Sequence, residues 1–97
     1  MQDPIQGAIE NRLIIEFNYH GHYRYAEPHV LGVHDGDVQV LCYQLDGTSS
    51  SGLIPEWRRF SLSDISGFSV TDDEFPGRRP GPTGRHSEWD YIIAIVQ

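Results

Sequence analysis

The sequence has 97 residues, of which 14 are acidic and 7 are basic, all arginine, so its formal net charge is −7. This acidity argues against broad nucleic-acid binding, because proteins that neutralise many phosphates carry extended basic surfaces. The single cysteine, Cys42, excludes a disulfide scaffold and a zinc site built from several thiolates. No apolar run reaches the roughly 20 residues that span a bilayer, and no charged-then-apolar leader opens the chain. We therefore expect a cytoplasmic protein with no membrane contact.

The first predicted element is a short helix that begins after Asp3 and ends near Asn11. Asp3 suits the N-cap, and Pro4 suits the first helical position, where no backbone donor is needed. Three apolar side chains then recur at helical spacing, namely Ile5, Ala8 and Ile9. This narrow apolar stripe predicts one face packed against the rest of the protein.

The body of the chain carries the signals of short β-strands. Apolar and polar side chains alternate with the period of two that is typical of half-buried strands. Tight hairpin turns are predicted at His20-Gly21 and Asp35-Gly36, and Pro28 predicts a kink or bulge. Residues 46–52 are predicted to form a loop. The expected strands cover residues 13–19, 23–27, 29–33, 38–43, 57–62 and 65–70.

The C-terminal part differs in composition from the body. Residues 76–86 are rich in proline, glycine and arginine, which is typical of a linker. Residues 87–97 alternate in apolar character, which favours a strand, although Ser87 and Asp90 also match a helical capping box. We predict a mainly β domain over residues 1–75, a linker and a C-terminal docking segment. One helix and several short strands with tight turns indicate a small β-barrel or a strongly bent sheet.

The residues that usually carry catalysis do not form a recognisable pattern. His20 and His22 flank a turn glycine without the further ligands that zinc needs, and we expect solvated turn residues rather than a metal site. Cys42 lies in an apolar strand, where a thiol is inert. The serines of 49–51 lack the strand-to-helix turn of a nucleophile. The sequence therefore predicts no enzyme, no metal site and no cofactor.

Two arginines fall within predicted strands. Arg58 shares the strand face of Phe60, so it points inward if that face is the core, and Arg24 lies opposite the face of Tyr23 and Tyr25. A buried guanidinium needs an acceptor. One interpretation pairs each arginine with an internal carboxylate such as Glu16 or Glu27. The other has both converge on an anionic ligand, since planar guanidinium groups suit phosphate.

The order of several segments resembles the WYL domain, a prokaryotic ligand-sensing module. The resemblance covers residues 4–70, and each of its motifs is degenerate alone. It has five parts in chain order: the opening helix, the first strand, a segment with an arginine followed by Glu-Pro, a turn with the strand that follows it, and a strand with the pattern Arg-x-Phe. The corresponding segments of this chain are 5–9, 15–19, 24–31, 35–43 and 58–65.

The resemblance implies an SH3-like or Sm-like barrel that binds a nucleotide or a piece of single-stranded nucleic acid. Carried over by position, the ligand-facing residues are Tyr19, Arg24, His29 and Arg58. The chain departs from the family at the triplet that names it, which is Val38-Gln39-Val40 here. It departs again at residue 64, where an aspartate replaces an arginine.

Two functions from different classes remain. The first is a regulatory module that senses a small anionic ligand and acts through a protein partner or a second copy, contacted by residues 87–97. The second is a structural or protein-interaction barrel whose pocket has degenerated, which the sign of Asp64 and the overall acidity favour. In the first case added ligand raises the melting temperature, and in the second it does not.

Overall fold

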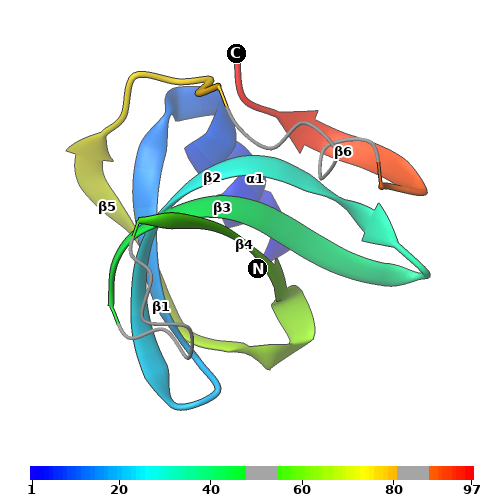
Figure 1. Ribbon diagram of the computed structural model, residues 1–97, viewed down its shortest axis with the longest axis horizontal. Helices are drawn as coiled ribbons and strands as arrows, with labels where there is room; N and C mark the ends of the chain where they lie inside the picture. The colour runs from blue at the N-terminus through cyan, green and yellow to red at the C-terminus, as the bar shows by residue number, and fades with distance from the viewer. Residues whose placement is uncertain (48–54, 81–87) are drawn as a thin grey trace.

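The computed structural model describes residues 1–47, 55–80 and 88–97 (Figure 1). The protein is mainly β, with one short N-terminal helix and an antiparallel sheet, as predicted. In chain order the elements are α1 (Gln2–Asn11), β1 (Leu13–Tyr19), β2 (His22–His34), β3 (Asp37–Gly47), β4 (Glu56–Ser61), the 3₁₀ turn η1 (Leu62–Asp64), β5 (Ile65–Glu74) and β6 (Tyr91–Ile95). No helix in these ranges is long and apolar enough to cross a bilayer.

The strand β2 is central to the sheet, because it pairs with β1, β3 and β6. The strand order is β4-β3-β2-β1-β5, and β6 pairs with β2 outside this path. Residues 22–26 of β2 pair with β1 and residues 30–33 pair with β6, while β3 runs along both halves. The register shifts between Pro28 and Val30, which confirms the predicted bulge. Because β2 bends at this bulge, its first half pairs with β1 and its second half pairs with β6. The sheet is strongly curved as a result (Figure 1).

Both predicted hairpin turns are confirmed. His20 and Gly21 have φ values of 51° and 79°, and Asp35 and Gly36 have 50° and 79°. Positive φ at both central residues is the type I′ geometry that matches the twist of the flanking strands. The predicted loop at 46–52 is wrong in its first two residues, because Asp46 and Gly47 belong to β3. The rest of that loop lies outside the described residues.

The helix α1 buries the predicted stripe of Ile5, Ala8 and Ile9. Its N-cap is Met1 rather than Asp3, which lies in the first turn and makes no capping hydrogen bond. The prediction of Asp3 as N-cap is therefore wrong, although an acidic group in the first turn still complements the helix dipole. Arg12 ends the helix in the left-handed conformation, with φ 55°.

The core lies between α1 and the inner face of the curved sheet, where α1 contacts β1, β2, β5 and β6. Large side chains from several strands fill it, among them Phe17, Leu31, Val40 and Phe60. Phe17 and Phe60 meet edge to face, with ring centroids 4.9 Å apart. Cys42 is fully buried in this cluster, as its strand position predicted.

The C-terminal segment returns to the body. β6 is a strand, so the favoured interpretation of residues 87–97 is confirmed for 91–95 and the helical one is wrong there. The Asp90 amide donates to the Val33 carbonyl and the Val96 amide donates to the His29 carbonyl, one at each end of β6. Residues 88–97 therefore dock on β2 of the same chain.

Candidate anion-binding site

Arg24 is a buried cation between neutral acceptors. Its neighbours along β2, Tyr23 and Tyr25, are more exposed, whereas Arg24 is only 3% exposed. One terminal nitrogen donates to Oε1 of Gln44 and the other to the backbone carbonyl of Tyr19, both at 3.3 Å. Its Nε is buried and has no partner among the described residues. Neither acceptor balances the positive charge, which is unusual because buried arginines are normally paired with carboxylates.

Arg58 lies beside this group on β4. It shares the strand face of the fully buried Phe60, as the alternation of the strand predicted, and it is partly exposed. Its terminal nitrogen contacts Oε1 of Glu56 at 3.1 Å. The predicted internal partners have other contacts: Glu16 accepts from Tyr23 and Ser69, and Glu27 contacts His29 and Arg79.

Aromatic rings hold the two guanidinium groups. The Cζ atoms of Arg24 and Arg58 lie 5.7 and 6.0 Å from the Phe60 ring centroid. Tyr19 packs edge to face on the same ring at 4.9 Å, and its hydroxyl accepts the Ser61 amide at 3.1 Å. Such cation–π contacts stabilise a guanidinium without neutralising it. We refer to Tyr19, Arg24, Arg58 and Phe60 as the Arg24 cluster.

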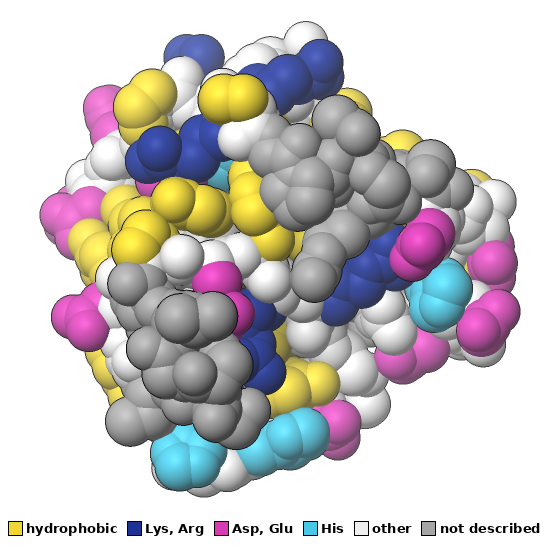
Figure 2. All heavy atoms as spheres, viewed as in Figure 1, with side chains coloured by type: hydrophobic (Ala, Val, Ile, Leu, Met, Phe, Trp, Pro, Cys, Tyr) yellow, Lys and Arg dark blue, Asp and Glu magenta, His cyan; other side chains and the backbone are white. Residues whose placement is uncertain are grey.

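The electrostatics of the cluster favour an incoming anion. Burial lowers the pKa of Arg24, and the like charge of Arg58 lowers it further, partly offset by Tyr19 and Glu56. The charge of a negative group between the two guanidiniums would act against both effects and favour the charged form of Arg24. On the face shown in Figure 2, arginine side chains form separate groups, some of them beside acidic side chains. Any anion bound there contacts a few arginines rather than a broad basic surface.

His29 does not belong to the Arg24 cluster. It is buried against Trp57, with ring centroids 4.7 Å apart, and against Phe75, at 5.3 Å. Trp57 precedes Arg58 in β4, so the two side chains point to opposite faces of the sheet. The structure therefore brings together Tyr19, Arg24 and Arg58 and places His29 elsewhere. The bulge after Pro28 breaks the alternation on which a placement by sequence depends.

The environment of His29 contains an ion pair that the sequence did not reveal. Arg79 donates from Nε and from a terminal nitrogen to the two carboxylate oxygens of Glu27, at 2.6 and 2.8 Å. His29 Nε2 lies 3.1 Å from the same carboxylate, and the Arg79 guanidinium lies 4.8 Å from the Tyr43 ring. Burial alone would raise the pKa of Glu27, but Arg79 and His29 outweigh it and lower the value. Because Arg79 lies in a Pro/Gly-rich stretch, no local signal marked it as a partner.

A second contact of the C-terminal segment fixes Trp89 beside β2. The Arg59 guanidinium lies 4.0 Å from the Trp89 ring, and its terminal nitrogen donates to the Glu88 carbonyl at 3.2 Å. A Cβ on Gly32 would lie 2.7 Å from Cε3 of Trp89, so only glycine permits this approach. Arg58 and Arg59 are adjacent in sequence, but Arg58 lies at the Phe60 ring and Arg59 lies at the Trp89 ring. A substitution of Arg59 is therefore a control for the same substitution of Arg58.

Comparisons with protein-family models, with curated proteins and with solved structures find no match.

Proposed function

We propose that this protein is a non-enzymatic regulatory module that binds a small anionic ligand at the Arg24 cluster. The ligand class is a nucleotide or a short single-stranded nucleic acid. Arg24 and Arg58 would bind the phosphate, and the ring of Tyr19 would border the bound group. His29, predicted from sequence as a fourth ligand-facing residue, is left out because it lies on the other side of the sheet from Arg58.

The observation that carries this proposal is the burial of Arg24 without a direct carboxylate partner among the described residues, with Glu56 only partly offsetting the effects that lower its pKa. Its two acceptors are neutral, its Nε has no partner among the described residues, and the like charge of Arg58 lowers its pKa further. Burying an ionised group without a counter-charge costs several kcal/mol, by order of magnitude. A bound phosphate supplies that counter-charge, and guanidinium groups suit its geometry.

The size and chemistry of the cluster favour a small ligand. Proteins that hold single-stranded nucleic acid combine a few cations with aromatic rings on which bases stack. The cluster offers two arginines beside one partly exposed aromatic ring, that of Tyr19, while Phe60 is fully buried beneath them. Such a site suits one or two phosphates rather than a long duplex.

The resemblance to the WYL domain supports the same ligand class. We further propose that the curved sheet is an SH3-like or Sm-like barrel. In support of this, β1 pairs with both β2 and β5, and the 3₁₀ turn η1 joins β4 to β5. Asp64, where the family has an arginine, contacts His20 at 3.4 Å. Because an aspartate stands where the family has an arginine, the site has one cation fewer with which to neutralise a ligand.

Thermal unfolding with a panel of ligands tests the proposal. The panel contains mononucleotides, cyclic nucleotides, short DNA and RNA oligonucleotides, and inorganic pyrophosphate, each at constant ionic strength. A ligand that binds only the folded state raises the melting temperature, and the rise grows with the logarithm of ligand concentration above the dissociation constant. We expect at least one nucleotide to do so for the wild type and not for Arg58→Gln. A panel without any shift would contradict the proposal.

A second candidate function is self-association through β6. This strand pairs only with β2 within the described ranges, and Tyr91 is 62% exposed beside the exposed Ile92 and Ile95. An apolar edge strand is a template for pairing with another chain, and a second antiparallel copy of β6 would continue the sheet. We propose a second copy of this chain as the occupant. Sedimentation of wild type and Ile92→Lys would show a dimer that the variant lacks, and a monomeric wild type would refute this.

A further inference from the structure

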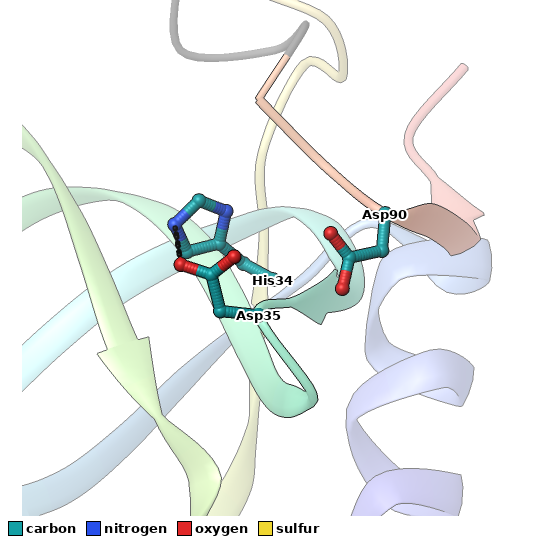
Figure 3. A group of neighbouring side chains, drawn as sticks. All are labelled: His34, Asp35 and Asp90. Carbon is teal, nitrogen blue, oxygen red and sulfur yellow. Dashed lines mark ion pairs between the residues drawn. The ribbon is translucent and has the colours of Figure 1, made fainter.

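A histidine and two aspartates converge at the tip of the hairpin between β2 and β3. His34 ends β2, Asp35 opens the turn, and Asp90 comes from the residue that precedes β6 (Figure 3). One potential ligand atom from each of the three lies within 4.8 Å of the others. Two segments that lie more than fifty residues apart in sequence therefore bring one imidazole and two carboxylates to one point.

The hydrogen bonding of His34 leaves its Nε2 available as a ligand atom. Nδ1 lies 2.9 Å from the backbone carbonyl of Glu88. Because a carbonyl oxygen only accepts, Nδ1 must carry the hydrogen. In the neutral ring the lone pair is then on Nε2, which lies 3.4 Å from Oδ2 of Asp35. Histidine ligands of metals are held in this way, with one ring nitrogen bonded to a carbonyl or carboxylate and the other on the metal.

The two carboxylates differ in how they are held. Asp90 accepts the Gly36 amide on Oδ2 at 3.2 Å, which ties it to the turn and leaves its other oxygen without a hydrogen bond among the described residues. The Asp35 side chain is 86% exposed and contacts Nε2 of His34 at 3.4 Å. One ligand is thus positioned by the backbone, and the other can adjust.

We propose that His34, Asp35 and Asp90 bind a zinc-class divalent metal ion, which fastens the start of β6 to the β2–β3 hairpin. Ligand atoms around a tetrahedral zinc ion lie about 3.3 Å apart, given bonds of about 2.0–2.1 Å. Rotation of the exposed Asp35 side chain would bring its carboxylate toward this spacing, while Asp90 keeps its contact with the Gly36 amide. Three protein ligands leave a coordination position for water, and the mixed nitrogen and oxygen set suits Zn²⁺ and Co²⁺ better than Ca²⁺.

Calorimetric titration of the full chain with ZnCl₂, in a buffer that does not bind metal, tests this site. We expect one ion per chain and a release of protons that depends on pH, because the ligands must be deprotonated. Asp90→Asn should weaken binding by at least about tenfold, a loss comparable with that of a supporting partner of a metal ligand. The asparagine side chain has the shape of aspartate and keeps an oxygen that can accept the Gly36 amide, so we expect the variant to fold. Circular dichroism checks that the variant is folded.

A control separates this site from the other histidines. His22 is exposed at the start of β2, and His22→Gln should bind zinc as the wild type does. In nitrogen-15 spectra of the histidine rings, zinc should shift Nε2 of His34 while Nδ1 keeps its hydrogen. The proposal is overturned if zinc does not bind, if Asp90→Asn binds as tightly as the wild type, or if His22→Gln abolishes binding.

Discussion

The guanidinium group of Arg24 is buried beside that of Arg58, with both directed at the ring of Phe60. Burial and then the like charge of Arg58 lower the pKa of Arg24. Arg58 contacts Glu56, whereas the acceptors of Arg24 are an amide and a backbone carbonyl. Burying a cation in this setting costs free energy of desolvation, which a bound anion would offset. This arrangement is the basis of our proposal that the Arg24 cluster binds an anion.

The ion pair between Arg79 and Glu27 should contribute measurably to stability. We expect Arg79→Gln to lower the free energy of unfolding by about 1–3 kcal/mol, because a buried carboxylate loses two charge-assisted hydrogen bonds while partial exposure of Arg79 screens the loss. Urea unfolding measures the change. In the Glu27→Gln background the loss of unfolding free energy caused by Arg79→Gln should be smaller, because the buried carboxylate charge is no longer present. Equal losses in both backgrounds would show that the pair contributes nothing.

The same carboxylate makes stability depend on acid pH. The folded-state pKa of Glu27 lies below its ordinary value, so its contribution is present above the unfolded-state pKa and is lost as pH falls through the folded-state value. We expect the urea midpoint to fall between about pH 5 and pH 3 in the wild type. In Arg79→Gln burial would dominate and raise the folded-state pKa of Glu27 above its unfolded-state value, so protonating Glu27 would stabilise the variant and its urea midpoint should fall less than that of the wild type over this range. Superimposable pH profiles would contradict this assignment.

The docking of Trp89 on β2 depends on Gly32. Gly32→Ala places a Cβ 2.7 Å from the Trp89 ring and 2.8 Å from the Tyr91 carbonyl, so we expect a loss of about 1–3 kcal/mol and altered tryptophan fluorescence. Gly7→Ala is the matched control, because nothing lies within 4 Å of its Cβ and alanine favours helix by up to about 1 kcal/mol. Unchanged fluorescence in Gly32→Ala would mean that the segment does not dock there.

Cys42 should be unreactive in the folded protein. Burial raises the pKa of its thiol, with the nearby charge of Glu27 adding to the shift, and the thiolate is the reactive form. Ellman's reagent at about pH 8 should detect no thiol in the native state and one per chain after denaturation. Rapid modification of the native protein would show that the strand opens locally.

The sequence predicted those features of the fold that depend on local pattern. Both Asp-Gly and His-Gly turns, the buried stripe of α1 and the bulge after Pro28 follow from residues a few positions apart. The alternation of β4 also predicted that Arg58 faces Phe60. Each of these rests on backbone conformation or strand period, which neighbouring residues determine.

Features that depend on distant segments were not predictable in the same way. The bulge moved His29 away from the Arg24 cluster, and its exact register emerges only when three strands pair. Arg79 lies in a stretch whose composition resembles a linker, yet it reaches Glu27 more than fifty residues away. The proposed metal site was hidden likewise, because Asp90 meets His34 only after β6 docks.

The central claim is tested most directly by fluorescence titration with single-stranded oligonucleotides and cyclic nucleotides. The comparison includes wild type, Arg58→Gln and Arg59→Gln, two neighbouring arginines that point to opposite faces of β4. The account predicts saturable binding by wild type and Arg59→Gln, and at least about tenfold weaker binding by Arg58→Gln, which removes a charged hydrogen bond. Equal binding by wild type and Arg58→Gln, or no binding by any of the three, would contradict it.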